Sequence, residues 1–542
     1  MSKIAYYLQE HLVGEVTDNL EVRRYFSTDG SILQMVPTTV AYPKNEDDVR
    51  KTARFSWQLA ERGKILPLTA RGGGSNTSGA AIGGGIMLIF PAHMNQVLAF
   101  DPKQQTVTLE PGISYQNLQQ MLQSHGWFLP PCPPSLAYST LGGGVASNYL
   151  GQKSLKYGAT GHYVKQLRVV LSNGEVIEVG PLNKRQLSHK MGLTNFEGQI
   201  YRQLDKLIEE SSEILAAAAK QVKSPRSVSG YNLHDIKDRG SFNLAPLLVG
   251  SQGSLGIITE ATLSIAPYPE PAELVLISLD DINELKEILP KILDLRPSVF
   301  DFINKAAMDT VTSINLSQLA GVLARPEAAI HLFIEFDDFK EADQKKAVKK
   351  LGKIVDKAGA WAEVFDPEND HDKFWKIRQS VSTILTGTKG QSRAVPVAED
   401  ISVPLEKFVD FLSRAEEVYS ELDLNAAAWG QAGDGMVRMR PMLNLAELGD
   451  RQKLFNIAGK LYAAVIEMGG SITASAGDGR VRAPYIQKQY GEDFYNLMLK
   501  VKKIFDPYGL LNPGVKTASL KDVKSLLRDE YKSSHYEHLA GS

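Results

Sequence analysis

The chain has 542 residues, of which 43% are hydrophobic and 23% charged, a composition typical of folded globular proteins. This length exceeds one ordinary domain and predicts about three or four core-forming units. Lysines and arginines number 60 against 62 acids, a formal net charge of −2 that gives no reason to expect a nucleic-acid partner. The single cysteine, Cys132, excludes an intramolecular disulfide and a thiolate metal cluster, and it fits a reducing compartment.

The N-terminal residues are interrupted by polar side chains and lack the apolar core of a signal peptide. No stretch approaches the ~18 apolar residues that a membrane span needs. The sequence therefore predicts a cytoplasmic protein without a transmembrane segment. It leaves open a peripheral contact with the inner face of the membrane and assembly into a homodimer.

The first half of the chain predicts strands and helices that lead up to a proline-rich boundary. Strand character is found at residues 40–43, 86–90, 106–109, 164–171, 175–179 and 257–265. Asn45 is the expected N-cap of a helix with acids in its first turn, which ends at Gly63. Further helices are expected over 115–122 and 183–221. Residues 267–271, with three prolines, are the predicted exit from the first domain.

The second half alternates strands and helices in a different order. Strands are expected at 274–279, 299–303, 330–336 and 361–365, and helices at 282–293, 340–357, 372–386, 405–420 and 447–468. This order predicts an antiparallel sheet covered by helices on one side, and hence an α+β fold. A helix over 485–504 leads back toward the first half, and 520–539 has the spacing of a docked amphipathic helix.

The segment that ends in Arg71-Gly-Gly-Gly-Ser-Asn-Thr-Ser-Gly79 has almost no side-chain bulk. Three successive glycines let the chain turn tightly, and their N–H groups can converge on an anion. No Gly-Lys-Ser/Thr follows, and no Gly-x-Gly-x-x-Gly with a downstream acid supports a Rossmann motif. The segment therefore indicates a pyrophosphate site, and a glycine loop without a ligand is the alternative.

Two more clusters of small residues follow. Ser139–Asn148 comes after the proline-rich segment 130–135, and the third cluster is Val249–Glu260. In this order and spacing the three clusters resemble the FAD-binding domain of the PCMH-type, vanillyl-alcohol-oxidase-like flavoproteins. The nearest branch is the group of the glycolate oxidase subunit, D-lactate dehydrogenase and D-2-hydroxyglutarate dehydrogenase. Residues 505–514 resemble the C-terminal signature of that group, so the resemblance covers nearly the whole chain.

The resemblance implies a three-part organisation. A two-subdomain PCMH-type FAD-binding domain would occupy 1–268, and an inserted cap domain with an antiparallel sheet and helices would occupy 269–480. The C-terminal segment 481–542 would return to pack on the FAD-binding domain.

The resemblance also assigns the three clusters to parts of FAD. The first would hold the pyrophosphate, the second the ribitol and the isoalloxazine edge, and the third the adenine half. The implied cofactor-binding residues are Arg71, Gly72, Gly73, Gly74, Ser75, Asn76, Thr77, Ser78, Ser135, Thr140, Gly142, Gly143, Val145, Asn148, Gly151, Gly158, Gln252, Gly253, Gly256, Ile257, Ile258 and Asn512. Some relatives attach FAD through a histidine near the first loop. Because this loop offers only Ser75 and Asn76, we expect non-covalent FAD, with a thioether to Cys132 as the alternative.

Two cap segments depart from the pattern of the group. Where the group has Gly-His-x-Gly-Asp-Gly-Asn-x-His, this chain has Gly430-Gln-Ala-Gly-Asp-Gly-Met-Val-Arg438. Where the group has Gly-Glu-His-Gly-Asp-Gly-Arg, it has Ala474-Ser-Ala-Gly-Asp-Gly-Arg480. The group's metal-binding histidines and its expected general base are thus replaced. Transition metals need imidazole and carboxylate donors, so we predict no metal.

Arginines lie in and near the segments that lack the group's histidines and base. Arg378 resembles the arginine that grips the substrate carboxylate in the group, and Arg438 and Arg480 lie in the altered segments. The alternative is that the cap arginines, Arg440 and Arg482 included, pair with Glu399, Asp400, Asp434 and Asp478.

A proton acceptor is also required for the oxidation of a hydroxy acid. His162 is the expected base, because the neighbouring segment approaches the flavin in relatives. Tyr231 and Tyr485 are the alternatives.

The sequence thus predicts an FAD-dependent oxidoreductase that acts on CH–OH donors. We expect hydride transfer from a small acidic substrate, a 2-hydroxy acid of the D-lactate or glycolate type, to flavin N5. The electron acceptor is open between a quinone, a cytochrome, a flavoprotein and oxygen. Two alternatives remain: a flavoprotein that keeps FAD for structure or partner binding, and an enzyme that oxidises another alcohol such as a sugar derivative.

Overall fold

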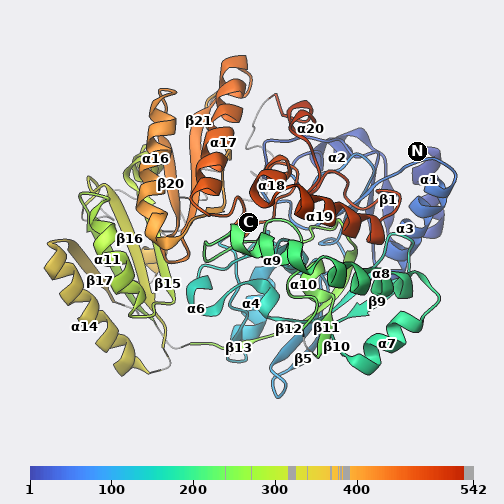
Figure 1. Ribbon diagram of the computed structural model, residues 1–542, viewed down its shortest axis with the longest axis horizontal. Helices are drawn as coiled ribbons and strands as arrows, with labels where there is room; N and C mark the ends of the chain where they lie inside the picture. Colours follow the sequence, from blue (N-terminus) through green and yellow to red (C-terminus); the bar gives the residue numbers. More distant parts are fainter. Residues whose placement is uncertain are drawn as a thin grey trace.

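The computed structural model describes residues 1–529 except 239, 270–271, 315–324, 339, 367–368, 371, 376–377, 379–380 and 382–390. In this part of the chain, the strands form sheets of four, five and eight strands and two short pairs. Figure 1 shows the eight-stranded sheet on the left, with the N-terminal part of the chain on the right. None of the described helices has the length and apolar character that a membrane crossing requires.

The four-stranded sheet carries the first glycine loop at its edge. Its order is β1-β2-β4-β3, with β2 and β3 both parallel to β4. The strands are β1 (Glu15–Thr17), β2 (Thr39–Tyr42), β3 (Leu68–Arg71) and β4 (Ile86–Ile89), and the helices beside them are α1 (Lys3–His11), α2 (Leu20–Tyr25) and α3 (Glu46–Glu61). As predicted, the Asn45 side chain caps α3 by accepting a hydrogen bond from the Asp48 N–H at 3.0 Å. Because β3 ends at Arg71, the loop begins where the sheet ends.

The five-stranded sheet is antiparallel, in the order β5-β6-β12-β8-β9. Its strands are β5 (Val97–Asp101), β6 (Thr106–Leu109), β8 (Val164–Val170), β9 (Val176–Val179) and β12 (Ile257–Ser264), and the short pairs are β7 (Trp127–Phe128) with β13 (Ala266–Pro267) and β10 (Pro181–Asn183) with β11 (Ser241–Asn243). The helices of this part are α4 (Tyr115–Gln123), α5 (Leu141–Ser147), α6 (Ser154–Tyr157), a 3₁₀ turn η1 (Thr160–His162) and α10 (Ala245–Leu248).

The helical segment predicted over 183–221 is interrupted twice. It forms α7 (Lys184–Gly192), α8 (Phe196–Glu210) and α9 (Ser212–Gln221). The backbone is extended at Leu193, with φ −65° and ψ 139°, and leaves the helical region again at Ser211. The helical character predicted for this range is therefore confirmed, as three helices.

The eight-stranded sheet forms the cap. Its order is β17-β14-β16-β15-β20-β21-β18, and β19 also pairs with β21. Every pair is antiparallel, as predicted. The strands are β14 (Glu273–Leu279), β15 (Val299–Asn304), β16 (Ile330–Phe336), β17 (Trp361–Phe365), β18 (Arg393–Ala394), β19 (Ile401–Ser402), β20 (Ala426–Gln431) and β21 (Met436–Leu443). The sequence did not predict β18 to β21.

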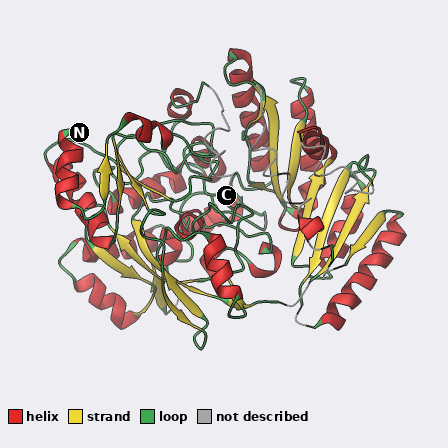
Figure 2. Cartoon of the chain, turned by 180° about the vertical axis from the view of Figure 1, so that it is seen from behind, coloured by secondary structure: helices red, strands yellow, loops and turns green. Residues whose placement is uncertain are grey.

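Helices cover both faces of the cap sheet, so the predicted one-sided cover is wrong. Successive residues of β14 belong to different clusters: Val275 and Ile277 pack with α11, and Leu274 and Leu276 with α12. Because successive side chains of a strand point to opposite faces, α11 and α12 lie on opposite faces. The cap helices are α11 (Glu284–Leu293), α12 (Lys305–Ile314), α14 (Glu341–Ala358), α16 (Phe408–Ser420), α17 (Leu448–Glu467) and the 3₁₀ turns η2 (Leu405–Lys407) and η3 (Ala432–Asp434). Figure 2 shows this part from behind.

The C-terminal segment lies against the N-terminal sheet, where Figure 1 draws the red helices beside the blue ones. Its helices are α18 (Ala483–Tyr490), α19 (Glu492–Phe505) and α20 (Leu520–Ser525). The helix predicted over 485–504 breaks at Gly491, whose φ is +86°. Leu511 forms a parallel bridge with Leu68, and the Asn512 N–H donates to the Leu68 carbonyl at 2.8 Å. Of the amphipathic helix predicted over 520–539, residues 530–539 lie outside the described residues.

Candidate active site

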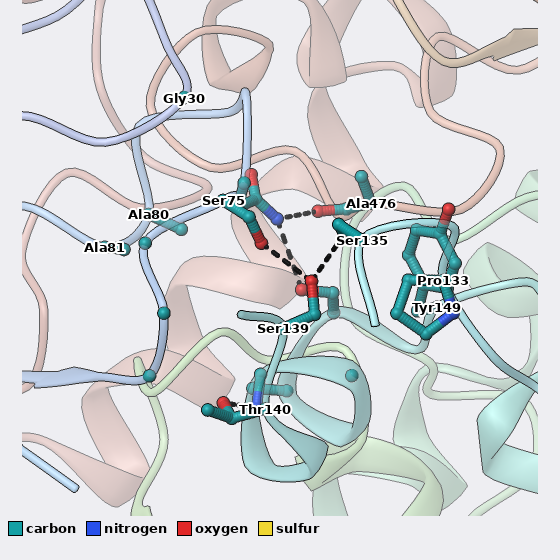
Figure 3. A pocket seen from close by; sticks show the side chains of 18 of the residues that line it. Gly30, Ser75, Ala80, Ala81, Pro133, Ser135, Ser139, Thr140, Tyr149 and Ala476 are labelled. Atoms are coloured by element: carbon teal, nitrogen blue, oxygen red, sulfur yellow. Dashed lines mark hydrogen bonds between the residues drawn. The ribbon is translucent and has the colours of Figure 1, made fainter. Parts of the chain in front are cut away.

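A cleft lies where the three glycine-rich loops meet one end of the cap sheet. Its open volume is about 1840 Å³, solvent at its mouth included, which is large enough for a dinucleotide. All three loops line it, so the sequence prediction that they converge holds for the described structure. The cap contributes Arg378, Glu399, Asp400, Trp429, Arg438, Arg440 and Ala476. Figure 3 shows part of this cleft from close by.

The first loop presents a row of backbone donors to the cleft. The N–H groups of Gly72 to Thr77 donate to no acceptor among the described residues. The loop is braced from behind, because Nη1 of Arg71 donates to the carbonyls of Thr28 at 2.8 Å and Ala81 at 2.9 Å. A row of unpaired N–H groups on a braced loop is the arrangement that binds phosphate oxygens.

The glycines of the loops serve two different purposes. A Cβ on Gly72 would overlap Thr140 Oγ1, and one on Gly73 would overlap the Tyr138 carbonyl. These glycines are therefore needed for the first two loops to pack on each other. A Cβ on Gly143 would meet only Thr140 Oγ1, at 3.3 Å, and one on Gly253 only Asn512 Nδ2, at 4.0 Å. These two leave space in the cleft itself.

Short hydroxyl and amide side chains link the loops across the cleft floor. Ser139 Oγ lies 3.1 Å from Ser75 Oγ and 2.6 Å from Ser135 Oγ. Nδ2 of Asn76 donates to the Ala476 carbonyl at 2.8 Å and to Ser147 Oγ at 3.2 Å. Figure 3 shows these contacts as dashed lines. The first loop is thus tied to both the second loop and the cap.

Asn512 joins the C-terminal segment to two of the loops. Its Nδ2 donates to the carbonyls of Ala80 at 2.8 Å and Gln252 at 2.9 Å. Its Oδ1 accepts from Arg480 Nη2 at 3.0 Å and Thr69 Oγ1 at 3.3 Å. Asn512 lies outside the cleft lining. It therefore supports the loops rather than reaching the cleft.

Arg480, a predicted catalytic residue, also lies outside the cleft lining. Nη1 donates to the Gly79 carbonyl at 2.6 Å, and Nη2 to the Pro513 carbonyl at 2.7 Å. Burial lowers the pKa of this guanidinium to about 10. Its contacts are those of a residue that connects the first loop to the C-terminal segment.

Most of the predicted cofactor residues line the cleft. They are Arg71, Gly72, Gly73, Gly74, Ser75, Asn76, Thr77, Ser135, Thr140, Gly142, Gly143, Gln252, Gly253, Gly256, Ile257 and Ile258. The lining does not include Ser78, Val145, Asn148, Gly151, Gly158 and Asn512. Asn148 illustrates the second set: it has φ +49°, and its Oδ1 accepts from the Gly161 N–H at 2.8 Å, which shapes the end of α5.

The cap arginines differ in how firmly the protein holds them. Arg378 is 4% exposed and donates through Nε to Asp301, whereas its two Nη groups have no partner among the described residues. Arg438 is held loosely, with Nη2 3.3 Å from Ser475 Oγ and 3.6 Å from Asp400 Oδ1. Arg378 and Arg438 therefore have donors left for a ligand.

The Asp301 carboxyl beside Arg378 is buried in β15. Burial raises the pKa of Asp301 to about 6, although the positive charge of Arg378 opposes this shift. Only one of its oxygens has a partner in the described structure, because Oδ1 accepts no hydrogen bond. Arg378 is thus oriented from one side by a buried carboxyl group that has a single hydrogen-bonded oxygen among the described residues.

The segments that depart from the family pattern hold protein contacts. Nε2 of Gln431 donates to the Gly151 carbonyl at 2.7 Å and Ser154 Oγ at 2.8 Å. Asp434 accepts from Ser154 Oγ at 2.5 Å and from Arg226 Nε at 2.9 Å. Gln431 and Asp434 therefore fasten the cap to α6. Among the described residues, no three His, Cys, Asp or Glu side chains gather as metal ligands would.

The lining also contains aromatic side chains that were not predicted, among them Tyr138, Tyr149 and Trp429. Tyr138 and Tyr149 flank the second glycine cluster, and Trp429 precedes the altered segment at Gly430. Their only signal in the sequence is this adjacency to a motif. Burial raises the pKa of Tyr149, with the charges of Arg438 and Arg378 acting against it.

The predicted bases lie elsewhere. His162, Tyr231 and Tyr485 are absent from the lining, which contains no histidine among the described residues. The His162 ring packs against Gly158, and the Tyr231 hydroxyl lies 2.8 Å from Ser254 Oγ. The base role of His162 stays a prediction.

Comparisons with known proteins cover most of the chain. A FAD binding domain matches residues 37–180, and the C-terminal domain of FAD linked oxidases matches residues 268–515. D-2-hydroxyglutarate dehydrogenase of Escherichia coli is 28% identical over 521 residues, which are 93% of this chain and 50% of that protein. This chain therefore spans about half the length of the curated relatives of that name. Glycolate oxidase subunit GlcD of Bacillus subtilis is 26% identical over 89% of both chains.

A solved structure has a similar fold. In 4-ethylphenol oxidase from Gulosibacter chungangensis, the match has a TM-score of 0.66 and 15% identity, and it covers 96% of this chain and 99% of that one. At this identity the likeness concerns the fold alone.

Proposed function

We propose, on the premise that this chain belongs to the FAD linked oxidases, that it oxidises a 2-hydroxy acid to the 2-oxo acid. The names of its relatives, D-2-hydroxyglutarate dehydrogenase and glycolate oxidase subunit, point to this class of substrate. The observation that carries the proposal is the cleft itself, in which glycine-rich loops face an arginine wall.

FAD is the cofactor, as the match to a FAD binding domain confirms. The cleft fits it, because the N–H groups of Gly72 to Thr77 are unpaired among the described residues and the cleft is open at Gly143 and Gly253. When bound, FAD supplies the chemistry of accepting two electrons as a hydride. Non-covalent binding is part of the proposal: Cys132 is not in the lining, and burial raises the pKa of its thiol to about 12.

Arg378 and Arg438 would hold the carboxylate of the substrate. A guanidinium matches a carboxylate with two parallel N–H donors, and Arg378 has both Nη groups free of described partners. Tyr149 is close enough to both arginines to feel their positive charge. Because burial raises its pKa, the phenol stays neutral and can donate a hydrogen bond. The chain's own residues thus bind the acid group and orient the substrate.

We propose that the cap works without a metal. Where the group has histidines, this chain has Gln431 and Arg438, and the cation of Arg438 would repel a metal ion. The test is elemental analysis of the purified protein. One tightly held zinc or manganese ion per chain would contradict the proposal.

We also propose the boundaries 1–268, 269–480 and 481–542 for the FAD-binding domain, the cap and the returning segment. The proline-rich stretch at 267 and the bridge from Leu511 to Leu68 support them. Limited proteolysis should cut first near residue 270.

An anaerobic stopped-flow screen tests the function. The proposal predicts that at least one D-2-hydroxy acid bleaches the flavin absorbance band. Bleaching by sugars and not by acids would favour a different alcohol substrate, such as a sugar derivative. No bleaching by either would favour a flavoprotein that keeps FAD for structure or partner binding. Reoxidation with a quinone, a cytochrome, a flavoprotein or oxygen would then identify the acceptor.

A further inference from the structure

The carboxylate of Glu399 lies in the cleft wall, and one of its two oxygens has no hydrogen-bond partner among the described residues. It is 3% exposed, lines the cleft and accepts a hydrogen bond at Oε1 from Arg440 Nε. Oε2 has no hydrogen-bond partner among the described residues. This oxygen also keeps some exposed surface, so a ligand in the cleft can reach it. A carboxylate with a free oxygen at the cleft surface can accept a proton.

The neighbouring carboxylate, Asp400, is fully occupied. Its oxygens accept from the N–H of Ser475 at 3.0 Å, the hydroxyl of Ser475 at 2.7 Å and the N–H of Ala476 at 2.6 Å. Arg482 Nη2 lies 3.4 Å from Oδ2. Asp400 therefore holds the chain in place, with φ +63°, and leaves Glu399 as the carboxylate with capacity for a proton.

Glu399 is fixed on several sides. The guanidinium of Arg440 packs over the Trp429 ring, 5.6 Å from its centroid, and so holds the ion pair in one position. The Glu399 carbonyl accepts from Arg482 Nη1 at 3.3 Å. A carboxylate held in this way needs little reorganisation when it accepts a proton.

Its position relative to Arg438 suits a 2-hydroxy acid. Arg438 and Arg440 are two residues apart on β21, so their side chains point to the same face about 7 Å apart. With its carboxylate on Arg438, a 2-hydroxy acid can turn the hydroxyl group of the adjacent carbon toward the Arg440–Glu399 pair. We infer that Glu399 is the catalytic base that removes the hydroxyl proton, an inference that rests on the proposed function.

The substrate O–H bond breaks and its proton goes to Glu399 Oε2, while the O–H electron pair forms the new C=O bond. The C–H bond at the same carbon breaks, and its electron pair leaves with the hydrogen as a hydride. The substrate is oxidised by two electrons and bound FAD is reduced. Glu399 then releases its proton to solvent.

The test is a comparison of Glu399→Gln with Tyr149→Phe in the FAD-loaded protein. We expect Glu399→Gln to slow flavin reduction by at least 100-fold, the usual effect of losing a general base. FAD content, and the Kd of the 2-oxo acid measured from the shift of the flavin spectrum, should stay within threefold of wild type. Tyr149→Phe should weaken binding of the 2-oxo acid and keep most of the reduction rate at saturating substrate.

A second variant separates catalysis from structure. Glu399→Ala should regain flavin reduction when acetate is added, because a free carboxylate can replace the missing base, and chloride at the same ionic strength should not help. A Glu399→Gln rate within tenfold of wild type, or a 100-fold loss in Tyr149→Phe alone, would overturn the inference and leave the proposed function standing. A wild-type protein that no 2-hydroxy acid reduces would reject the proposed function, and Glu399 as its base with it.

Discussion

The cap arginines of the cleft differ in how closely acidic side chains of the protein pair with them. Arg440 is committed to Glu399, Arg378 is half committed to Asp301, and Arg438 is held by contacts of 3.3 Å and 3.6 Å. The sequence left open whether these arginines pair with acids or bind substrate. Among the described residues all three pair with acids, and Arg378 and Arg438 also keep donors that can bind a substrate.

Arg438→Gln is expected to weaken binding of the acid. A hydrogen bond to a charged group contributes about 1.5–3 kcal/mol, so the Kd of the 2-oxo acid should rise about 10–100-fold. Titration of the flavin spectrum measures this constant. Arg325→Gln, a change at a partly exposed cap arginine that pairs with Asp280 and lies outside the cleft lining, is the matched control. Equal Kd values for Arg438→Gln and wild type would remove Arg438 from the substrate site.

Asp301 predicts a pH dependence of stability. Burial raises its pKa in the folded protein to about 6, above the ~3.9 of an unfolded chain. The folded state therefore binds this proton more tightly. The corresponding stability is present below about pH 4 and is lost as the pH rises through 6.

Each pKa unit corresponds to about 1.4 kcal/mol, so wild type should lose about 2–3 kcal/mol relative to Asp301→Asn between pH 4 and 7. Urea unfolding followed by circular dichroism at several pH values gives the comparison. Parallel pH curves for the two proteins would show that Asp301 is ionised throughout.

At the scale of an element, two adjacent glycines of α5 have different roles: Gly142 allows close packing inside the protein, and Gly143 leaves space in the cleft. A Cβ on Gly142 would lie 2.5 Å from Pro111 Cβ and 2.8 Å from the Pro111 carbonyl oxygen, both in a neighbouring segment. A Cβ on Gly143 would meet only Thr140 Oγ1. The same substitution should therefore act on stability at one position and on the cofactor at the next.

Gly142→Ala should lower the free energy of unfolding by about 1–3 kcal/mol, the usual cost of overpacking. Gly143→Ala should leave the stability of the apoprotein intact, since alanine favours helix, but should weaken FAD binding. Thermal unfolding of the apoprotein and fluorescence titration with FAD distinguish the two effects. Unchanged FAD affinity in Gly143→Ala would place the flavin away from α5.

In the turn at residue 512, both the contacts of the side chain and the positive φ favour asparagine. The side chain contacts Ala80, Gln252, Arg480 and Thr69, and φ is +42°. Asn512→Gly keeps the backbone and loses the contacts, and we expect the Kd of FAD to rise at least tenfold. Asn512→Ala should also lower the melting temperature, because alanine is strained at positive φ. Asn232→Gly, at a position outside the cleft lining, should leave the Kd of FAD unchanged.

At the scale of the whole molecule, the parts that the sequence predicted are those encoded locally. The glycine loops, the Asn45 cap and the strands of the first half depend on neighbouring residues, and all three loops line one cleft. The order β15-β20-β21 brings Asp301 and Arg438 to the same region from positions 137 residues apart in number. No local pattern encodes that order, so the proximity of Asp301 and Arg438 could not be predicted.

The same limit explains why the predicted bases are not in the cleft lining. His162 was chosen for its residue type and its neighbourhood in the sequence, but it packs against Gly158. Glu399 lies in an irregular segment after β18, where the sequence suggested only a partner for arginine. A carboxylate is recognised as reactive only when the number of its partners is known, and this depends on tertiary structure.

The return of the C-terminal segment to the N-terminal sheet has a consequence for biosynthesis. Asn512 buttresses loops that were translated more than 250 residues earlier, and Leu527 bridges to Leu33. A nascent chain still attached to the ribosome at residue 500 has neither contact. The seat for the flavin is therefore complete only after residues 512 and 527 have been synthesised and have packed on the N-terminal sheet, and we expect FAD to bind after that step.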